Sequence, residues 1–207
     1  QVKELAEKWF GDIPAGEKYI RNIPQEPAQT EAHFLEVKAA VPLDALYKCW
    51  HISTRLDKKY YVADMITEIL GGGSSSRLFQ SLVKEQQLFS SIHCAHLGSI
   101  DAGLLYIEGK LVKGVSIEDG EMGVMAELEK IKSEKIAENE LQKIKNKTES
   151  LLAFEDISLM NRANSLANYE LLGDADLMNK ELSIYQSVTS DEIFEECHRI
   201  FVDNNCS

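Results

Sequence analysis

The residues most suited to binding a metal ion are five histidines: His33, His51, His93, His96 and His198. Histidine is the commonest metal ligand in proteins, but none of the five begins His-x-x-Glu-His, a helical zinc-binding motif. The closest pair is His93 and His96, within a stretch that reads as a strand. Residues three apart on a strand point to opposite faces, so both cannot bind one metal ion from regular geometry. We therefore expect no zinc site in this chain.

The run Gly71-Gly72-Gly73-Ser74-Ser75-Ser76 is the second candidate for chemistry. A phosphate-binding loop would follow a strand and end in Gly-Lys-Ser/Thr, whereas this run follows a helical pattern and lacks that ending. It also lacks the Gly-x-Ser-x-Gly arrangement of a nucleophilic serine. The run instead predicts two helix ends in succession. Gly71 would take the left-handed conformation that ends a helix, and Ser74 to Ser76 would cap the next one.

Two helices and two strands surround this run. The segment 56–70 predicts a helix, with Lys58, Lys59, Asp64 and Glu68 on the outside, that buries Tyr61, Val62, Met65, Ile66, Ile69 and Leu70. A short second helix would bury Leu78, Phe79, Leu82 and Val83. Residues 90–100 and 103–112 then predict two strands joined by a turn at 101–103.

The remaining segments favour strands before the glycine run and helices after the last strand. Residues 32–42 and 45–53 predict a hairpin. Helices are expected from Ser116 to about residue 132, from Glu138, over 158–172 and after Thr189, whose capping partner is Glu192. The second and third of these would bury Leu141, Ile144, Leu151, Leu152, Leu159, Ala163, Leu166 and Ala167. The fold class is α+β, an antiparallel β-sheet with helices packed on one face.

Composition excludes several functions. The formal net charge of −12 argues against a nucleic-acid or anionic-membrane partner, because both need a basic surface. No stretch approaches the roughly 18 consecutive apolar residues of a membrane span. Cys49, Cys94, Cys197 and Cys206 lack zinc-finger or redox spacing. We interpret them as free thiols, mostly buried, although the sequence leaves a disulfide open.

The first 28 residues differ from the rest. Residues 1–10 predict an amphipathic helix with Val2, Leu5, Ala6, Trp9 and Phe10 on one face. Residues 18–30 are polar, contain two prolines and lack apolar periodicity, as in a linker. We expect a domain boundary near residue 28, with the opening helix packing as a guest or protruding.

The run LGGGSSSRLFQ, followed by VKEQQLFSSI, resembles the signature of the pitrilysin (insulinase-like) zinc peptidases, and in particular their second, non-catalytic domain. The resemblance covers nearly the whole chain. It implies that residues 1–28 are the last helix of a preceding catalytic-type domain plus a linker, and that residues 29–207 are the non-catalytic domain without its final strand. It also implies a sheet with an open edge. The residues that match the family's structural loop are Gly71, Gly72, Gly73, Ser74, Ser75, Ser76 and Arg77.

In many second domains of this family an arginine and a tyrosine, seven residues apart, reach into the active site. The matching positions here are Val83 and Ser90. An arginine can pair with a carboxylate or carbonyl, and a phenol can stabilise an oxyanion; valine and serine cannot do the same at these positions. The resemblance therefore implies possible substrate-groove positions at Val83 and Ser90 and no catalytic residue in this chain.

The implied function is that of an inactive domain of a zinc-dependent endopeptidase. The zinc would belong to the preceding domain, which carries His-x-x-Glu-His in active members, and the partners would be that catalytic half and peptide substrates. The alternative is a scaffold of the same fold, such as the core subunits of the respiratory bc1 complex, without proteolysis. The two differ in whether the preceding domain has the zinc motif.

Overall fold

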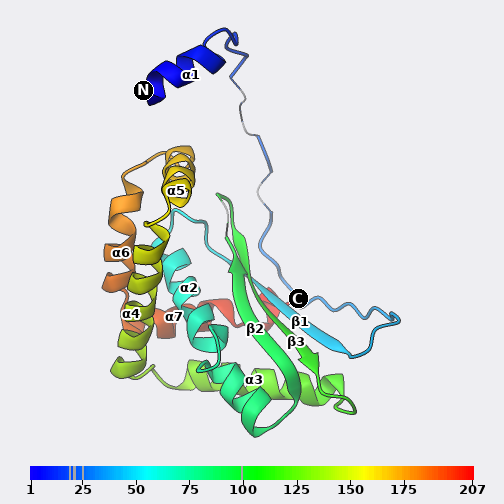
Figure 1. Ribbon diagram of the computed structural model, residues 1–207. Coiled ribbons are helices and arrows are strands. Elements are labelled where there is room, and N and C mark those ends of the chain that lie inside the picture. Colours follow the sequence, from blue (N-terminus) through cyan, green and yellow to red (C-terminus); the bar gives the residue numbers. More distant parts are fainter. Residues whose placement is uncertain (19, 21, 25, 99) are drawn as a thin grey trace.

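A three-stranded antiparallel sheet forms one layer of the molecule, and helices cover one of its faces (Figure 1). The computed structural model describes residues 1–18, 20, 22–24, 26–98 and 100–207. Three residues of the expected linker, Tyr19, Arg21 and Gln25, and Ser99 near the end of an expected strand lie outside the described residues. The strand order is β1-β3-β2, with β1 spanning Ala45–Ile52, β2 Phe89–Leu97 and β3 Gly103–Leu111. The predicted α+β class is confirmed.

The helices follow the predicted order with two additions. The predicted elements are α1 (Val2–Phe10), α2 (Lys58–Gly71), a π-helix η1 (Phe79–Glu85), α3 (Ile117–Ser133), α4 (Glu138–Glu155), α5 (Leu159–Leu171) and α7 (Ser190–Ile200). The additions, for which the sequence analysis made no prediction, are α6 (Leu177–Ser187) and a short 3-10 helix, η2 (Asp203–Asn205). Two predicted N-caps are present. Ser116 accepts from Asp119 N, and Thr189 forms a full capping box with Glu192.

The core lies between the sheet and α2. All six residues predicted to be buried on this helix are buried, and Asp57 caps its start by accepting from Lys59 N. The helix packs on β2 and α7. Along β3 the buried residues alternate with partly or fully exposed ones, which gives the sheet one apolar face for α2.

The end of α2 differs from the prediction. Gly71 is still helical, and Gly73 is the residue with positive φ, at 116°. A Cβ at Gly71 would lie 2.8 Å from Cys94 Cα and closer still to its backbone nitrogen. Glycine at 71 therefore allows close helix–strand contact. Ser76 does not cap a helix N–H but donates its hydroxyl to Gly73 O, at 2.6 Å.

The predicted strand at 32–42 was wrong. These residues lie in no strand, and Phe34, Leu35 and Val37 are all more than 70% exposed. One side of β1 pairs with β3, and the chain's last residues occupy the other side, where Cys49 and Ser207 exchange backbone hydrogen bonds. The contact of 32–42 with that region is His33 N donating to Cys206 O at 3.0 Å, so β1 and this segment form no hairpin.

The predicted burial of five apolar residues was also wrong. Leu151 on α4, and Leu159 and Leu166 on α5, are at least half exposed, and Ala163 and Ala167 on α5 are exposed as well. Tyr169 is the one buried residue of α5. The helix packs on α6 with the Tyr169 side, so most of its apolar positions point away from the core.

A bidentate ion pair joins the glycine-serine loop to α4. Arg77 Nε and one terminal nitrogen donate to the two carboxylate oxygens of Glu140, at 3.0 and 2.6 Å. Both side chains are about three-quarters buried. The hydrogen bond to Glu140 raises the pKa of Arg77 despite this burial. Arg77 thus ties the loop to an element 63 residues further along the chain.

We expect Gly71→Ala to lower the free energy of unfolding by about 1–3 kcal/mol, because the added methyl group overlaps the Cys94 backbone. Urea denaturation followed by circular dichroism measures the loss. Gly16→Ala is the matched control, since nothing lies within 4 Å of a Cβ there. Equal stability of the two variants would contradict the tight contact.

We expect Glu140→Gln to lower the free energy of unfolding by about 1–2 kcal/mol, since it leaves a largely buried arginine without its charged partner. The control is Glu36→Gln, which removes the exposed pair with Lys38 and should change stability by less than about 0.5 kcal/mol. The same urea titration compares them. A loss at Glu36 as large as that at Glu140 would show that the Arg77 contact has no special role.

Candidate functional site

The π-helix η1 carries the first candidate position, Val83, and is fixed by a buried polar contact. Ser81 donates its hydroxyl to Glu127 Oε1 of α3 at 2.6 Å, and Lys130 also binds that oxygen. Gln86 donates to the Ser81 hydroxyl at 2.8 Å. Val83 itself is partly buried and packs on the hydrophobic core. Its side chain therefore contributes to the core, whether or not it also faces a substrate groove.

Ser90 lies at an irregularity of β2. The register with β3 shifts between Phe89 and Ser91, so Ser90 is the bulged residue. Its side chain is exposed, and its hydroxyl donates to Lys110 O at 3.0 Å. Gln87, with a φ of 55°, makes the turn from η1 into this strand. Val83 and Ser90 thus flank one turn, but no hydrogen bond joins them and their exposures differ.

The two histidines of β2 point to opposite faces, as predicted. His93 is exposed, and its ring lies 6.5 Å from that of Tyr106. His96 faces α2, where Nε2 is 2.7 Å from Tyr60 Oη and Nδ1 is 3.2 Å from Asp64 Oδ1. Within the part of the chain that the structure describes, no cluster of three or more histidine, cysteine or acidic residues is suited to a metal ion. The residues present do not fit a zinc site.

A polar network that the sequence analysis did not predict surrounds the first turns of α2. Asp64 accepts from the Tyr185 hydroxyl of α6 at 2.5 Å, in addition to its pair with His96. Burial raises the pKa of Tyr185, and the Asp64 carboxylate raises it further. The phenol is therefore a protonated donor at neutral pH and not a base. The network joins β2, α2 and α6.

Arg55 extends this network to α5. It donates to Glu181 Oε1 at 2.5 Å and to the Tyr169 hydroxyl at 3.3 Å, and Tyr169 donates to Glu181. Its guanidinium also lies over the Tyr60 ring, 4.6 Å from the centroid. Burial alone would lower the pKa of Arg55, but Glu181 together with the nearby tyrosines outweighs burial and raises it. These charges pair internally, so the cluster positions helices and offers no free acid, base or nucleophile.

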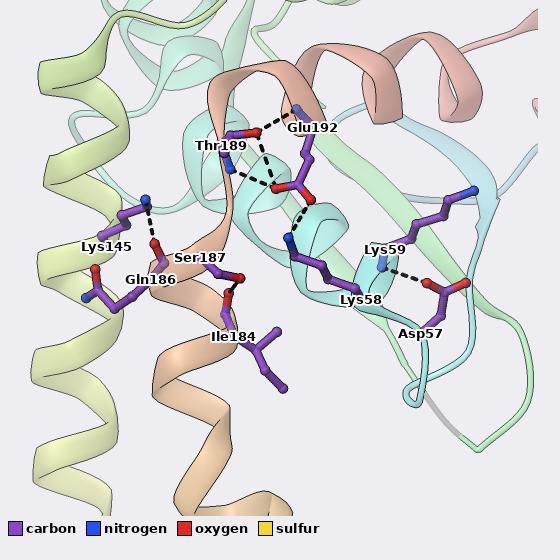
Figure 2. A network of polar contacts seen from close by, with 9 residues as sticks. All are labelled: Asp57, Lys58, Lys59, Lys145, Ile184, Gln186, Ser187, Thr189 and Glu192. Atoms are coloured by element: carbon purple, nitrogen blue, oxygen red, sulfur yellow. Dashed lines mark hydrogen bonds and ion pairs between the residues drawn. The ribbon is translucent and has the colours of Figure 1, made fainter.

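A cavity of about 320 Å³ lies beside this network, lined by Arg55, Leu56, Lys58, Tyr61, Leu177, Ile184 and Ser187. Figure 2 shows part of its surroundings: Lys58 binds Glu192 of the capping box, and Ser187 donates to Ile184 O. The two cations at its wall are already paired, with Glu181 and Glu192. Neither Val83 nor Ser90 lines it.

The four cysteines are free thiols, of which Cys94 and Cys197 are buried. Burial raises the pKa of the Cys197 thiol to about 12, so it is not a thiolate at neutral pH. Among the described residues, each helix is too short or too polar to span a bilayer.

Comparison with known proteins relates this fold to peptidases. The chain is similar in structure to a protease from Helicobacter pylori, with a TM-score of 0.92 and 23% identity over 99% of this chain and 50% of that chain. A peptidase M16 inactive domain from Pseudomonas fluorescens matches with a TM-score of 0.76 and 16% identity, over 99% and 48% of the two chains. A chain of complex III from Candida albicans matches with a TM-score of 0.68 and 16% identity, over 82% and 42%.

At these identities the structural matches show the fold alone, and the chain spans about half the length of the Helicobacter pylori protease. A search of the curated proteins gave no match. The sequence model described as the peptidase M16 inactive domain, however, matches residues 1–148, which is more than two thirds of the chain. The chain therefore belongs to the peptidase M16 inactive-domain family, the pitrilysin-like group that its glycine-serine run resembles.

Proposed function

We propose that this chain is the non-catalytic half of a zinc-dependent endopeptidase and that it encloses peptides together with a zinc-binding domain of the same fold. The observation that carries the proposal is the family match over residues 1–148. The similarity to a protease of which the chain spans half the length is consistent with it. The proposal assigns the zinc to the other half, and in this chain His93 and His96 point to opposite faces of β2.

The division of the chain is part of the proposal. Residues 1–28 are the last helix of the catalytic-type domain and a linker, and residues 29–207 are the inactive domain. In support, none of the residues of α1 is buried, whereas the core begins in β1. The outer edge of β1 at Ala45–Lys48 fits the expectation of one further strand beside it, since the described strands lie on its other side. That strand remains a prediction.

A scaffold without proteolysis is the second candidate. The similarity to a chain of complex III, the bc1 complex, favours it. The internal pairing of Arg55, Asp64 and Glu181 is also compatible with a purely structural role. The two functions differ in whether the other half binds zinc, and that difference decides between them.

We expect the intact protein to hold one zinc ion per chain and to cleave peptides, and the 207-residue chain to do neither. Metal analysis after dialysis and a quenched fluorogenic peptide measure both properties. A folded intact protein without zinc or cleavage would support the scaffold. A tightly held zinc in the 207-residue chain would contradict the assignment of zinc to the other half.

Val83 and Ser90 take the positions of the arginine and tyrosine of many relatives. We expect Val83→Arg with Ser90→Tyr in the intact protein to raise kcat/KM for peptides, by about tenfold at most. One transition-state hydrogen bond is worth roughly a hundredfold, but the surroundings are not shaped for these side chains.

Steady-state kinetics on the two single variants and the double variant measure the gain. Ser91→Tyr, at the neighbouring exposed position of β2, is the control for adding a phenol. A double variant that folds and shows no gain would mean that another residue supplies this role, or that the protein is a scaffold.

A further inference from the structure

An exposed apolar surface covers the end of α4 and the outer side of α5. Five large apolar side chains of this α4–α5 surface range from 50% to 81% exposed, and they are Leu151, Phe154, Ile157, Leu159 and Met160. Monomeric proteins seldom expose large contiguous apolar patches without a binding function. The α4–α5 surface therefore calls for an explanation.

The α4–α5 surface is held in place by the rest of the fold. Met160, Ala163, Ala167 and Leu171 recur at helical spacing, so they share one side of α5. Tyr169 lies nine residues from Met160, which is two and a half turns, and therefore points the opposite way. There it binds Glu181 and Arg55. The inner side is anchored, and the apolar side points away from the core.

A second apolar surface lies on α1. Val2, Trp9 and Phe10 are each more than two-thirds exposed, and Leu5 is 52% exposed. Figure 1 shows α1 beyond the α5 end of the molecule. The Helicobacter pylori protease matches 99% of this chain, α1 included, with a TM-score of 0.92. A match this close leaves little room for a different placement of α1, although the chain buries none of its residues.

We propose that the α4–α5 surface and the apolar side of α1 bind the same body, the other half of the protein. The proposal rests on the proposed function. The body must reach both surfaces at one end of the molecule, and it must be large enough to cover each. The chain spans 50% of the Helicobacter pylori protease, so the remaining half of a protein of that size is large enough. The contact would be apolar at its centre, where Phe154 and Met160 lie, as in stable domain interfaces.

Hydrogen–deuterium exchange tests this proposal on the intact protein and the 207-residue chain. We expect the amides of α1 and of residues 151–171 to exchange at least tenfold more slowly in the intact protein, because burial of their side chains suppresses local opening. Amides of α3 around Met122, another exposed apolar residue, should exchange alike in both. Equal exchange at 151–171 would overturn the proposal.

A variant pair tests the surface itself. Phe154→Glu with Met160→Glu in the intact protein should abolish the slow exchange of 151–171, while α1, which the proposed function makes a helix of the other half, should stay slow. Met122→Glu, which adds the same charge on an exposed site of α3, should leave it unchanged. All these side chains are more than 60% exposed, so each variant should keep its circular dichroism spectrum. Slow exchange at 151–171 that survives in the double variant would overturn the proposal.

Two measurements separate this proposal from its rivals and from the proposed function. Analytical ultracentrifugation measures the oligomeric state of the samples used for exchange. If residues 151–171 exchange slowly only in samples that are dimeric, the surface belongs to a second copy and the proposal is overturned. Zinc analysis tests the proposed function separately. An intact protein without zinc that still protects both surfaces would defeat the peptidase reading and support the contact between halves.

Discussion

The close approach of α2 to β2 is the constraint on which the rest of the structure depends. Gly71 lies so near the Cys94 backbone that a side chain would overlap it, and the helix buries its apolar residues from Tyr61 to Leu70 against the sheet. A helix buried in this way has few polar positions left. Two of those, Asp64 and Glu68, bind His96 and Lys147 from other elements. The central helix is therefore fixed by polar contacts as well as by its apolar side, which suits a supporting domain.

Periodicity and capping residues in the sequence were sufficient to predict most of the elements. The buried residues of α2, the strands β2 and β3 and the Thr189 capping box all depend on neighbours in sequence, so local patterns indicate them. The failed strand at 32–42 shows the limit of such patterns. Its alternation is genuine, but a strand also needs a partner strand, and the backbone hydrogen bond from His33 goes to Cys206 and not to β1. Sequence spacing carries no information about which partner a segment finds.

The candidate site was predictable in part for the same reason. The glycine-serine run marked the correct loop, and Arg77 within it, but not its partner Glu140, 63 residues away. The network of Asp64, His96 and Tyr185 was missed entirely, because its members come from three elements and each alone looks ordinary. Val83 and Ser90 were indicated only by resemblance. The structure gives them different environments, one against the core and one on a bulge, so a shared role must come from what lies opposite them.

The wrong prediction for α5 has a different cause. A helical apolar period shows that one side of a helix is buried, but it does not show which molecule buries it. For α2 the covering surface is the chain's own sheet, whereas for α5 the chain's own contact is made by Tyr169 on the other side of the helix. The same holds for α1, whose amphipathic pattern is as clear and whose residues are all exposed. Two helices whose apolar sides are left uncovered at the same end of the molecule are better explained by a common missing surface than by two independent accidents of sequence.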